Sequence, residues 1–259
     1  MSFVVNHLEK GPADSDAIIF LHGVGGDAHS WDFQLEGFSE SYRAIAWDMP
    51  GYGESPLVSP MTFEMLSDSF ISLLDHLKID QAHVVGHSMG GMVAQQAIAT
   101  SPDRFKSLIL SATSPAFGKA DGVFQKQFIA ARLKPLEDGL SMAELAKKQV
   151  PNMVGDTPNP KGLEMAYSSM SKVRIETFTA AMHCLVTFDR RDNLSLIKTP
   201  TLLISGEKDT NAPAPMMEKM GSKIPGAEYI CMANVGHLSN IEKPKEFNNV
   251  VKKFIEKTS

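Results

Sequence analysis

Cysteine is scarce in this sequence of 259 residues, which contains only Cys184 and Cys231. Two cysteines without metal-type spacing argue against a disulfide framework and against a zinc site. Free cysteine is among the most frequently buried residue types, and Cys231 lies in the apolar run EYICMA. We therefore expect two buried free thiols and no metal site.

An excess of positive charge and long apolar runs are also missing. The chain has 25 basic and 30 acidic residues, which gives no positive footprint for a nucleic acid. No segment approaches 18 uninterrupted apolar residues, and the first ten residues do not resemble a signal peptide. We expect a soluble cytoplasmic protein without nucleic-acid or membrane partners, either a monomer or a small homo-oligomer.

The sequence does contain an alternation of strand and helix patterns that is typical of the α/β class. Short, continuous apolar runs predict strands that are covered on both faces, and therefore a mainly parallel sheet. They lie at residues 16–22, 43–48, 82–88, 107–112, 201–205 and 228–232. Helical patterns lie at 62–76, 88–100, 214–223 and 245–256. This order indicates a doubly wound sheet with right-handed crossovers.

One interval, residues 112–190, departs from this alternation because it contains helix signals but no convincing strand. The signals include the helical spacing of Phe124 and Phe128, and a capping box formed by Ser141 and Glu144. We expect a helical cap over 112–190, inserted into one α/β core made of 1–111 and 191–259. The cap is the least acidic part of the chain. Its scattered basic residues predict a solvated helical face, and an anionic substrate is the alternative.

The pattern Gly-x-Ser-x-Gly at Gly86, Ser88 and Gly90 is the first chemical signal. Alone it is weak, since it occurs by chance in about one chain in ten of this size. Its surroundings make it stronger, because a strand pattern ends at Gly86 and a helix pattern begins at Met89. Ser88 therefore lies on a tight strand-to-helix turn, which is the position of a nucleophile elbow.

A serine hydroxyl needs a base to remove its proton, and the base needs an acid to hold its tautomer. Asp209 follows a predicted strand, and His237 follows the last one, which completes a triad in a known chain order. Glu207 is the nearby alternative acid, but its position in GEKD favours Asp209. The oxyanion donors are expected to be the backbone N–H groups of Met89 and Val24, with Gly25 as the alternative to Val24.

Five ordered motifs carry a resemblance to a known family. They are HGVGG (22–26), DMPGYGES (48–55), GHSMGG (86–91), GEKDTNAP (206–213) and the pair Gly236–His237. With them the chain resembles the α/β-hydrolase fold family, above all its small carboxylesterase and 3-oxoadipate enol-lactonase-like members. The resemblance implies a mostly parallel sheet of seven or eight strands, flanked by helices and carrying an inserted helical cap. The short stretch before residue 16 leaves room for one antiparallel strand, which favours seven.

Several other residues have more ordinary interpretations. His22 and His87 are expected to hydrogen-bond the backbone near the elbow, because one general base suffices. Most of a set of apolar cap residues should form the core of the cap, and a minority should face Ser88. The set is Phe117, Phe124, Phe128, Met142, Met153, Met165, Met170 and Met182. Our substrate-binding candidates are Trp31, Phe117, Met182 and His183.

These signals together predict a cofactor-free serine hydrolase that cleaves a small carboxylic ester or lactone through an acyl-enzyme on Ser88. Two alternatives stay open at this point. The same triad serves carbon–carbon bond hydrolases and cofactor-free perhydrolases, whose pockets differ. A small-ligand signal receptor or regulator with slow or single turnover is the alternative outside the enzymes.

Overall fold

The computed structural model describes residues 4–117 and 122–258, which form a seven-stranded sheet in the order β1-β3-β2-β4-β5-β6-β7. The strands are β1 (His7–Lys10), β2 (Ala17–Leu21), β3 (Arg43–Trp47), β4 (Ala82–His87), β5 (Phe105–Ser111), β6 (Thr201–Gly206) and β7 (Glu228–Met232). β1 pairs antiparallel with β3, and all the other pairs are parallel. This confirms the α/β-hydrolase sheet predicted from the sequence, in its seven-stranded form.

Helices cover both faces of the sheet, and each face has its own apolar core. They are α1 (Asp32–Phe38), α2 (Phe63–His76), α3 (Met89–Thr100), α8 (Ala214–Gly221), α9 (Ser239–Glu242) and α10 (Pro244–Thr258). On one face, Phe70 of α2, Val93 of α3 and Met217 of α8 are fully buried together. On the other face, Leu35 of α1 and Phe247 of α10 are buried. Covering both faces explains why the central strands are continuously apolar.

The order of the strands determines where a site can form. β4 lies in the middle of the sheet, and β2 and β5 pair with it on either side. From β2 the chain moves outward to form β3, and it then crosses back to β4 and continues in the other direction through β5 and β6 to β7. In open α/β sheets, ligands bind at the carboxyl ends of the strands beside such a reversal. Ser88 follows the last residue of β4, so the elbow lies at this point.

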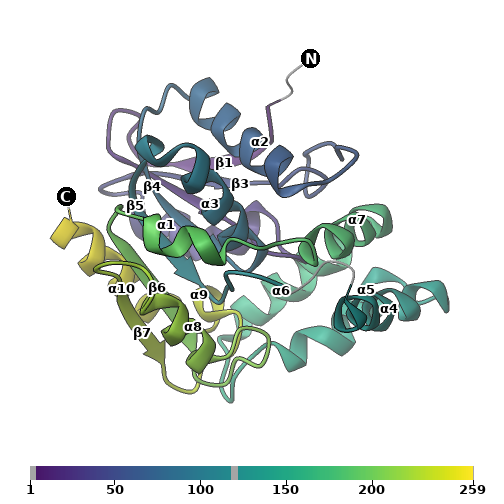
Figure 1. Cartoon of the computed structure of the whole chain (residues 1–259). Coiled ribbons are helices and arrows are strands. Elements are labelled where there is room, and N and C mark those ends of the chain that lie inside the picture. The colour runs from purple at the N-terminus through teal and green to yellow at the C-terminus, as the bar shows by residue number, and fades with distance from the viewer. Residues whose placement is uncertain (1–3, 118–121, 259) are drawn as a thin grey trace.

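Four longer helices lie between β5 and β6, gathered on one side of the molecule (Figure 1). They are α4 (Val123–Glu137), α5 (Met142–Gln149), α6 (Pro160–Lys172) and α7 (Ile175–Leu185). The expected capping box is present at the start of α5, where Ser141 and Glu144 bond each other's backbone N–H. α6 was not predicted, although Asn159 caps it and Pro160 is its first residue. The cap boundaries 112–190 stay our proposal, and residues 118–121 lie outside the described part.

The two chain segments that lead into and out of these helices pair with each other. Phe117 N–H donates to the Phe188 carbonyl at 2.8 Å, and Arg190 N–H donates to the Pro115 carbonyl at 2.8 Å. The described residues also form four 3₁₀ helices: η1 (Ala28–Trp31), η2 (Pro102–Arg104), η3 (Val150–Asn152) and η4 (Arg191–Leu196). Among the described residues, no helix is long and apolar enough to cross a membrane.

The prediction for the cysteines was right for one and wrong for the other. Cys184 is buried on α7, whereas Cys231 is exposed. Cys231 belongs to β7, which is the edge strand of the sheet and has only β6 beside it. An apolar run on an edge strand is less completely covered than one in the centre, so the periodicity of the run overstated its burial.

Candidate active site

Ser88 lies on the expected turn between β4 and α3, with φ 52° and ψ −119°. A positive φ is costly for a residue with a side chain, and such strain is often found at functional sites. The turn closes because its flanks are glycines. A Cβ on Gly86 would lie 2.6 Å from the Gly91 Cα, and one on Gly90 would collide with the Leu21 carbonyl oxygen. The glycine pattern is therefore a steric requirement of the elbow.

His237 and Asp209 form a buried pair across the ends of β6 and β7. His237 Nδ1–H donates to Asp209 Oδ2 at 2.8 Å. The other carboxylate oxygen of Asp209 accepts the N–H groups of Asn211 at 2.8 Å and Ala212 at 3.0 Å. Burial disfavours the charge on Asp209, but these hydrogen bonds and the imidazole outweigh it and hold the pKa of Asp209 below its usual value. The proton on Nδ1 leaves Nε2 of His237 free to accept another.

The loop that carries His237 is held in place by Glu242, a buried residue that sequence reasoning missed. Its carboxylate accepts N–H groups from Gly236 at 3.0 Å and Leu238 at 3.1 Å, on either side of the histidine, and from Gly155 at 2.6 Å. Burial raises the pKa of Glu242 despite these donors. The sequence carries no clear signal for this role, because only the folded loop brings the three N–H groups together.

Two backbone N–H groups remain without an acceptor beside Ser88. Among the described residues, neither Val24 nor Met89 donates a backbone hydrogen bond outside a helix or strand. Val24 lies in the glycine loop after β2, and Met89 is the first residue of α3, where helical N–H groups have no internal partner. A Cβ on Gly23 would lie 2.7 Å from the Ser88 Cβ. The glycine loop therefore approaches the serine closely.

His22 and His87 hydrogen-bond the backbone, as expected. His22 Nδ1–H donates to the Gly23 carbonyl at 2.8 Å, and its Nε2 accepts the Met49 N–H at 3.0 Å. His87 Nε2–H donates to the His237 carbonyl at 2.9 Å. Burial lowers the pKa of His87 to about 3, with a further contribution from His237. Both rings are neutral supports for the loops around Ser88.

The DMPGYGES segment supports the same region. Asp48 accepts the Ala28 N–H at 2.8 Å and the Glu54 N–H at 3.2 Å. A Cβ on Gly53, whose φ is 48°, would collide with the Asp48 carboxylate. The ring of Tyr52 packs edge-on against His22, with 5.0 Å between the ring centres. The glycines in this segment therefore make turns that support the loop after β2.

A cavity of about 610 Å³ opens over Ser88, within the range of small-molecule sites. Ser88, His237 and Val24 all line it, so the structure brings these three predicted residues to the same cavity. Of our substrate-binding candidates, Phe117 and Met182 line this cavity. Among the described residues, His237 included, none forms a hydrogen bond with the Ser88 hydroxyl, which leaves it available to a ligand.

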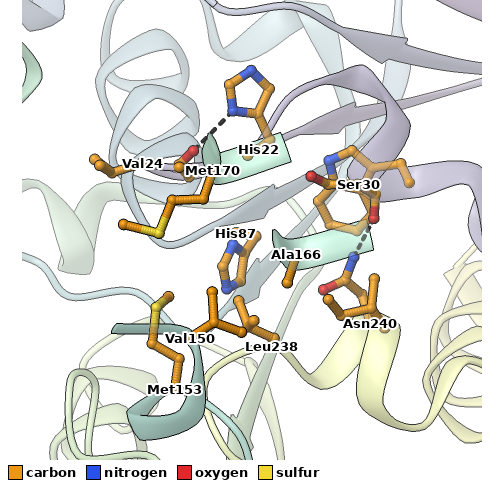
Figure 2. Close-up of a pocket in the computed structure, with 15 residues that line it drawn as sticks. His22, Val24, Ser30, His87, Val150, Met153, Ala166, Met170, Leu238 and Asn240 are labelled. Carbon is orange, nitrogen blue, oxygen red and sulfur yellow. Dashed lines mark hydrogen bonds between the residues drawn. The ribbon is translucent and has the colours of Figure 1, made fainter. Parts of the chain in front are cut away.

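The other two candidates lie elsewhere. His183 is exposed on α7 and lines neither cavity, because one step along a helix turns a side chain by about 100° away from Met182. Trp31 lines a second, small cavity of about 40 Å³ behind the glycine loop. In Figure 2 the His87 ring lies in this small cavity among side chains from the loop after β2, from the cap and from the loop after β7.

The apolar cap residues face the large cavity more often than we expected. Of the eight residues in the set, only Met142 and Met165 are absent from its lining. Six of the eight therefore line the cavity, where we expected a minority, and two of these six, Met170 and Met182, also belong to the buried apolar core. The lining also includes Arg132, Gln149 and Thr210, none of which was a candidate. Among the described residues, no group of His, Cys, Asp and Glu side chains could hold a metal ion.

Comparison with known proteins agrees with this fold. Residues 16–244 match the family model described as alpha/beta hydrolase fold. The 3-oxoadipate enol-lactonase 2 of Acinetobacter baylyi is 28% identical and covers 95% of this chain and 91% of its own length. The crystal structure of the enol-lactonase from Burkholderia xenovorans LB400 has a TM-score of 0.86, 26% identity, and coverage of 97% of this chain and 96% of that one.

A longer protein is similar as well. The dihydrolipoyllysine-residue acetyltransferase component of the acetoin cleaving system from Cupriavidus necator is 31% identical over 97% of this chain. This chain spans only 66% of the length of that relative. Since the family model covers most of the sequence and the sheet has the matching topology, the chain belongs to the α/β-hydrolase fold family.

Proposed function

We propose that this protein is a serine hydrolase that cleaves a small carboxylic ester or lactone through an acyl-enzyme on Ser88. The proposal rests on one observation above all. A serine on a strained elbow, a histidine already oriented by a buried aspartate and the Val24 backbone line one cavity large enough for a small molecule, and Met89, with the second N–H, directly follows the serine. A carboxylic ester needs these groups together.

In the proposed acylation step, Ser88 Oγ attacks the carbonyl carbon while His237 Nε2 takes the hydroxyl proton. The carbonyl oxygen becomes an oxyanion, which accepts hydrogen bonds from the N–H groups of Val24 and Met89. Asp209 holds the imidazole in the required tautomer and stabilises its positive charge. His237 then donates its proton to the leaving alkoxide as the carbon–oxygen bond breaks. The products are an alcohol and an acyl-enzyme.

Deacylation reverses these roles with water as the nucleophile. His237 takes a proton from the water as its oxygen attacks the acyl carbon, and the same two N–H groups donate hydrogen bonds to the oxyanion. The bond to Ser88 Oγ breaks, and the serine recovers its proton from His237. With a lactone, the leaving hydroxyl stays attached to the acid that is released. We also propose, from the sequence, that the protein acts in the cytoplasm without a cofactor.

The experiment that tests this proposal is steady-state hydrolysis of p-nitrophenyl acetate, butyrate and octanoate beside a panel of γ-lactones and an enol-lactone. Ser88→Ala should reduce kcat by at least about 10³-fold, because the nucleophile is lost. The melting temperature should change little. Near-wild-type activity in the variant would end this mechanism. A burst of one equivalent followed by no steady state would favour the signal receptor.

A further inference from the structure

The large cavity contains a cation, Arg132, that has no anionic partner among the described residues. Arg132 of α4 lines the cavity and is partly buried. Its guanidinium lies over the Phe128 ring, 5.1 Å from the ring centre. Within the described part of the chain it forms no ion pair and no hydrogen bond with protein groups. A guanidinium has five donors, so its capacity to bind an acceptor is unused.

The rest of the lining supports this interpretation of Arg132. None of the described residues that line the cavity is an aspartate or a glutamate. The second arginine of the lining, Arg191, is already paired with the Asp189 carboxylate, which accepts two of its donors. Arg132 is therefore the cation of this cavity that a ligand can neutralise. Burial lowers the pKa of Arg132.

The position of Arg132 relative to the reacting groups indicates which part of a ligand it would meet. Ser88 and His237 belong to β4 and the loop after β7, whereas Arg132 belongs to the cap. The aromatic rings of Phe117, Phe124 and Phe128 lie in the same lining. A substrate would thus place its ester carbonyl at Ser88, an apolar segment along the rings and a charged end at Arg132.

We propose that Arg132 determines specificity in this cavity, and that the preferred ester or lactone carries a second, ionised carboxylate on its acyl part. The inference deepens the proposed function and rests on it. A guanidinium binds a carboxylate through two parallel N–H···O bonds, and partial removal from water strengthens them. A single unpaired guanidinium matches the single charge of a carboxylate.

The test compares isosteric substrates that differ in charge. Monomethyl adipate and methyl adipamate have nearly the same shape, but only the first ends in a carboxylate. The wild type should prefer the acid over the amide by about 10- to 100-fold in kcat/KM, which is the range for a hydrogen-bonded ion pair. Repeating the pair with succinate and glutarate would show at which chain length the preference is largest.

Variants of α4 assign the preference to a residue. In Arg132→Gln the acid-to-amide ratio should fall below about 3, whereas Arg132→Lys should keep part of it. Lys134→Gln is the matched control, since Lys134 lies on the same helix, is exposed and pairs with Asp138. It removes the same formal charge and should keep the wild-type ratio within about twofold. A wild-type ratio near one, or a ratio unchanged in Arg132→Gln, would overturn the proposal.

A binding measurement separates this proposal from the proposed reaction. Calorimetric titration of adipate and of adipamide into Ser88→Ala does not depend on turnover. Adipate should bind at least about tenfold more tightly than adipamide, and the double variant Ser88→Ala/Arg132→Gln should lose this difference. If the esters are not hydrolysed but adipate still binds through Arg132, the proposed function fails and the anion site stands. If adipate and adipamide bind equally, the anion site fails.

Discussion

Asp209 acts on His237 through the proton that the two side chains share. The carboxylate accepts Nδ1–H at 2.8 Å, and this leaves Nε2 with its lone pair. Two backbone N–H groups fix the second oxygen, so the carboxylate is not free to rotate. A side chain of the same shape with a donor at that position would favour the wrong tautomer. In the proposed mechanism the Asp209 carboxylate is therefore needed for its negative charge and because it carries no proton of its own.

Asp209→Asn tests this role. The amide places either an NH₂ group or an uncharged oxygen at the position where the carboxylate accepts the His237 Nδ1–H. The value of kcat should fall by a factor of order 10³ to 10⁴, as in other triads with this change. The fold should persist because the shape is unchanged. Ester hydrolysis and the melting temperature are the two measurements.

Glu207 supplies the control for Asp209. It is the other acid in the same loop, and among the described residues its carboxylate accepts a hydrogen bond from the exposed Asn234 N–H alone, at 2.8 Å. Glu207→Gln should keep kcat within about threefold of the wild type. Equal losses in the two variants would show that the loop, and not the Asp209 carboxylate, controls activity.

At the scale of secondary-structure elements, the cap contacts the loop that carries His237 (the histidine loop) through close backbone contacts. The His237 N–H donates to the Met153 carbonyl at 2.7 Å. α6 begins against α9, where a Cβ on Gly162 would collide with the Ile241 carbonyl oxygen. Glu242, the last residue of α9, ties Gly155 of the cap to the same loop. The position of the histidine loop thus depends on how closely the first turn of α6 approaches α9.

Gly162→Ala tests this contact. The added methyl group meets backbone, which cannot rotate away, so overpacking should reduce the free energy of unfolding by about 1–3 kcal/mol. The corresponding fall in melting temperature is a few degrees for a chain of this size. We also expect kcat to fall, because α9 and the histidine loop move together.

Ser168→Ala is the matched control for Gly162→Ala. Ser168 lies on the same helix with its side chain exposed, and alanine is a better helix former than serine. This variant should melt at or slightly above the wild-type temperature with unchanged kcat. A Gly162→Ala protein that matched it in both respects would contradict the close packing of α6 on α9.

At the scale of the whole molecule, His83 couples stability to pH. It is buried on β4, bonds Ser107 Oγ at 2.9 Å through Nδ1, and has no partner for Nε2 among the described residues. Burial and the charge of Lys106 lower the pKa of His83 to about 4. In the unfolded chain a histidine has a pKa of about 6.5. Between these values the unfolded state binds the proton and the folded state does not, so stability falls as pH decreases through this window.

His83→Gln should therefore lose less stability on acidification than the wild type. In urea titrations, the free energy of unfolding that the variant loses between pH 7 and pH 4.5 should be smaller than the wild-type loss by at most about 2–3 kcal/mol. His87 contributes in the same direction and remains in the variant. His76→Gln, which removes an exposed imidazole from α2, should keep the wild-type pH dependence. Parallel curves for His83→Gln and the wild type would refute the linkage.

The sheet and the core of the candidate site could be predicted because their signals are local. Buried parallel strands read as continuous apolar runs, and an elbow needs glycines at fixed positions around Ser88. The placement of pocket residues depends instead on how each cap helix is rotated. That rotation separates Met182 from the exposed His183 and turns Arg132 toward the cavity. Glu242 was missed because its three donors meet only after folding.

The central claim is a covalent bond to Ser88, and trapping that bond tests it most directly. The protein would be treated with diethyl p-nitrophenyl phosphate, which transfers a stable diethylphosphoryl group to an activated serine and releases p-nitrophenol. Intact and peptide mass spectrometry would then locate the group. The account predicts one equivalent on the peptide that contains Ser88 and none in Ser88→Ala. Ester turnover without modification of Ser88, or equal modification of the variant, would contradict it.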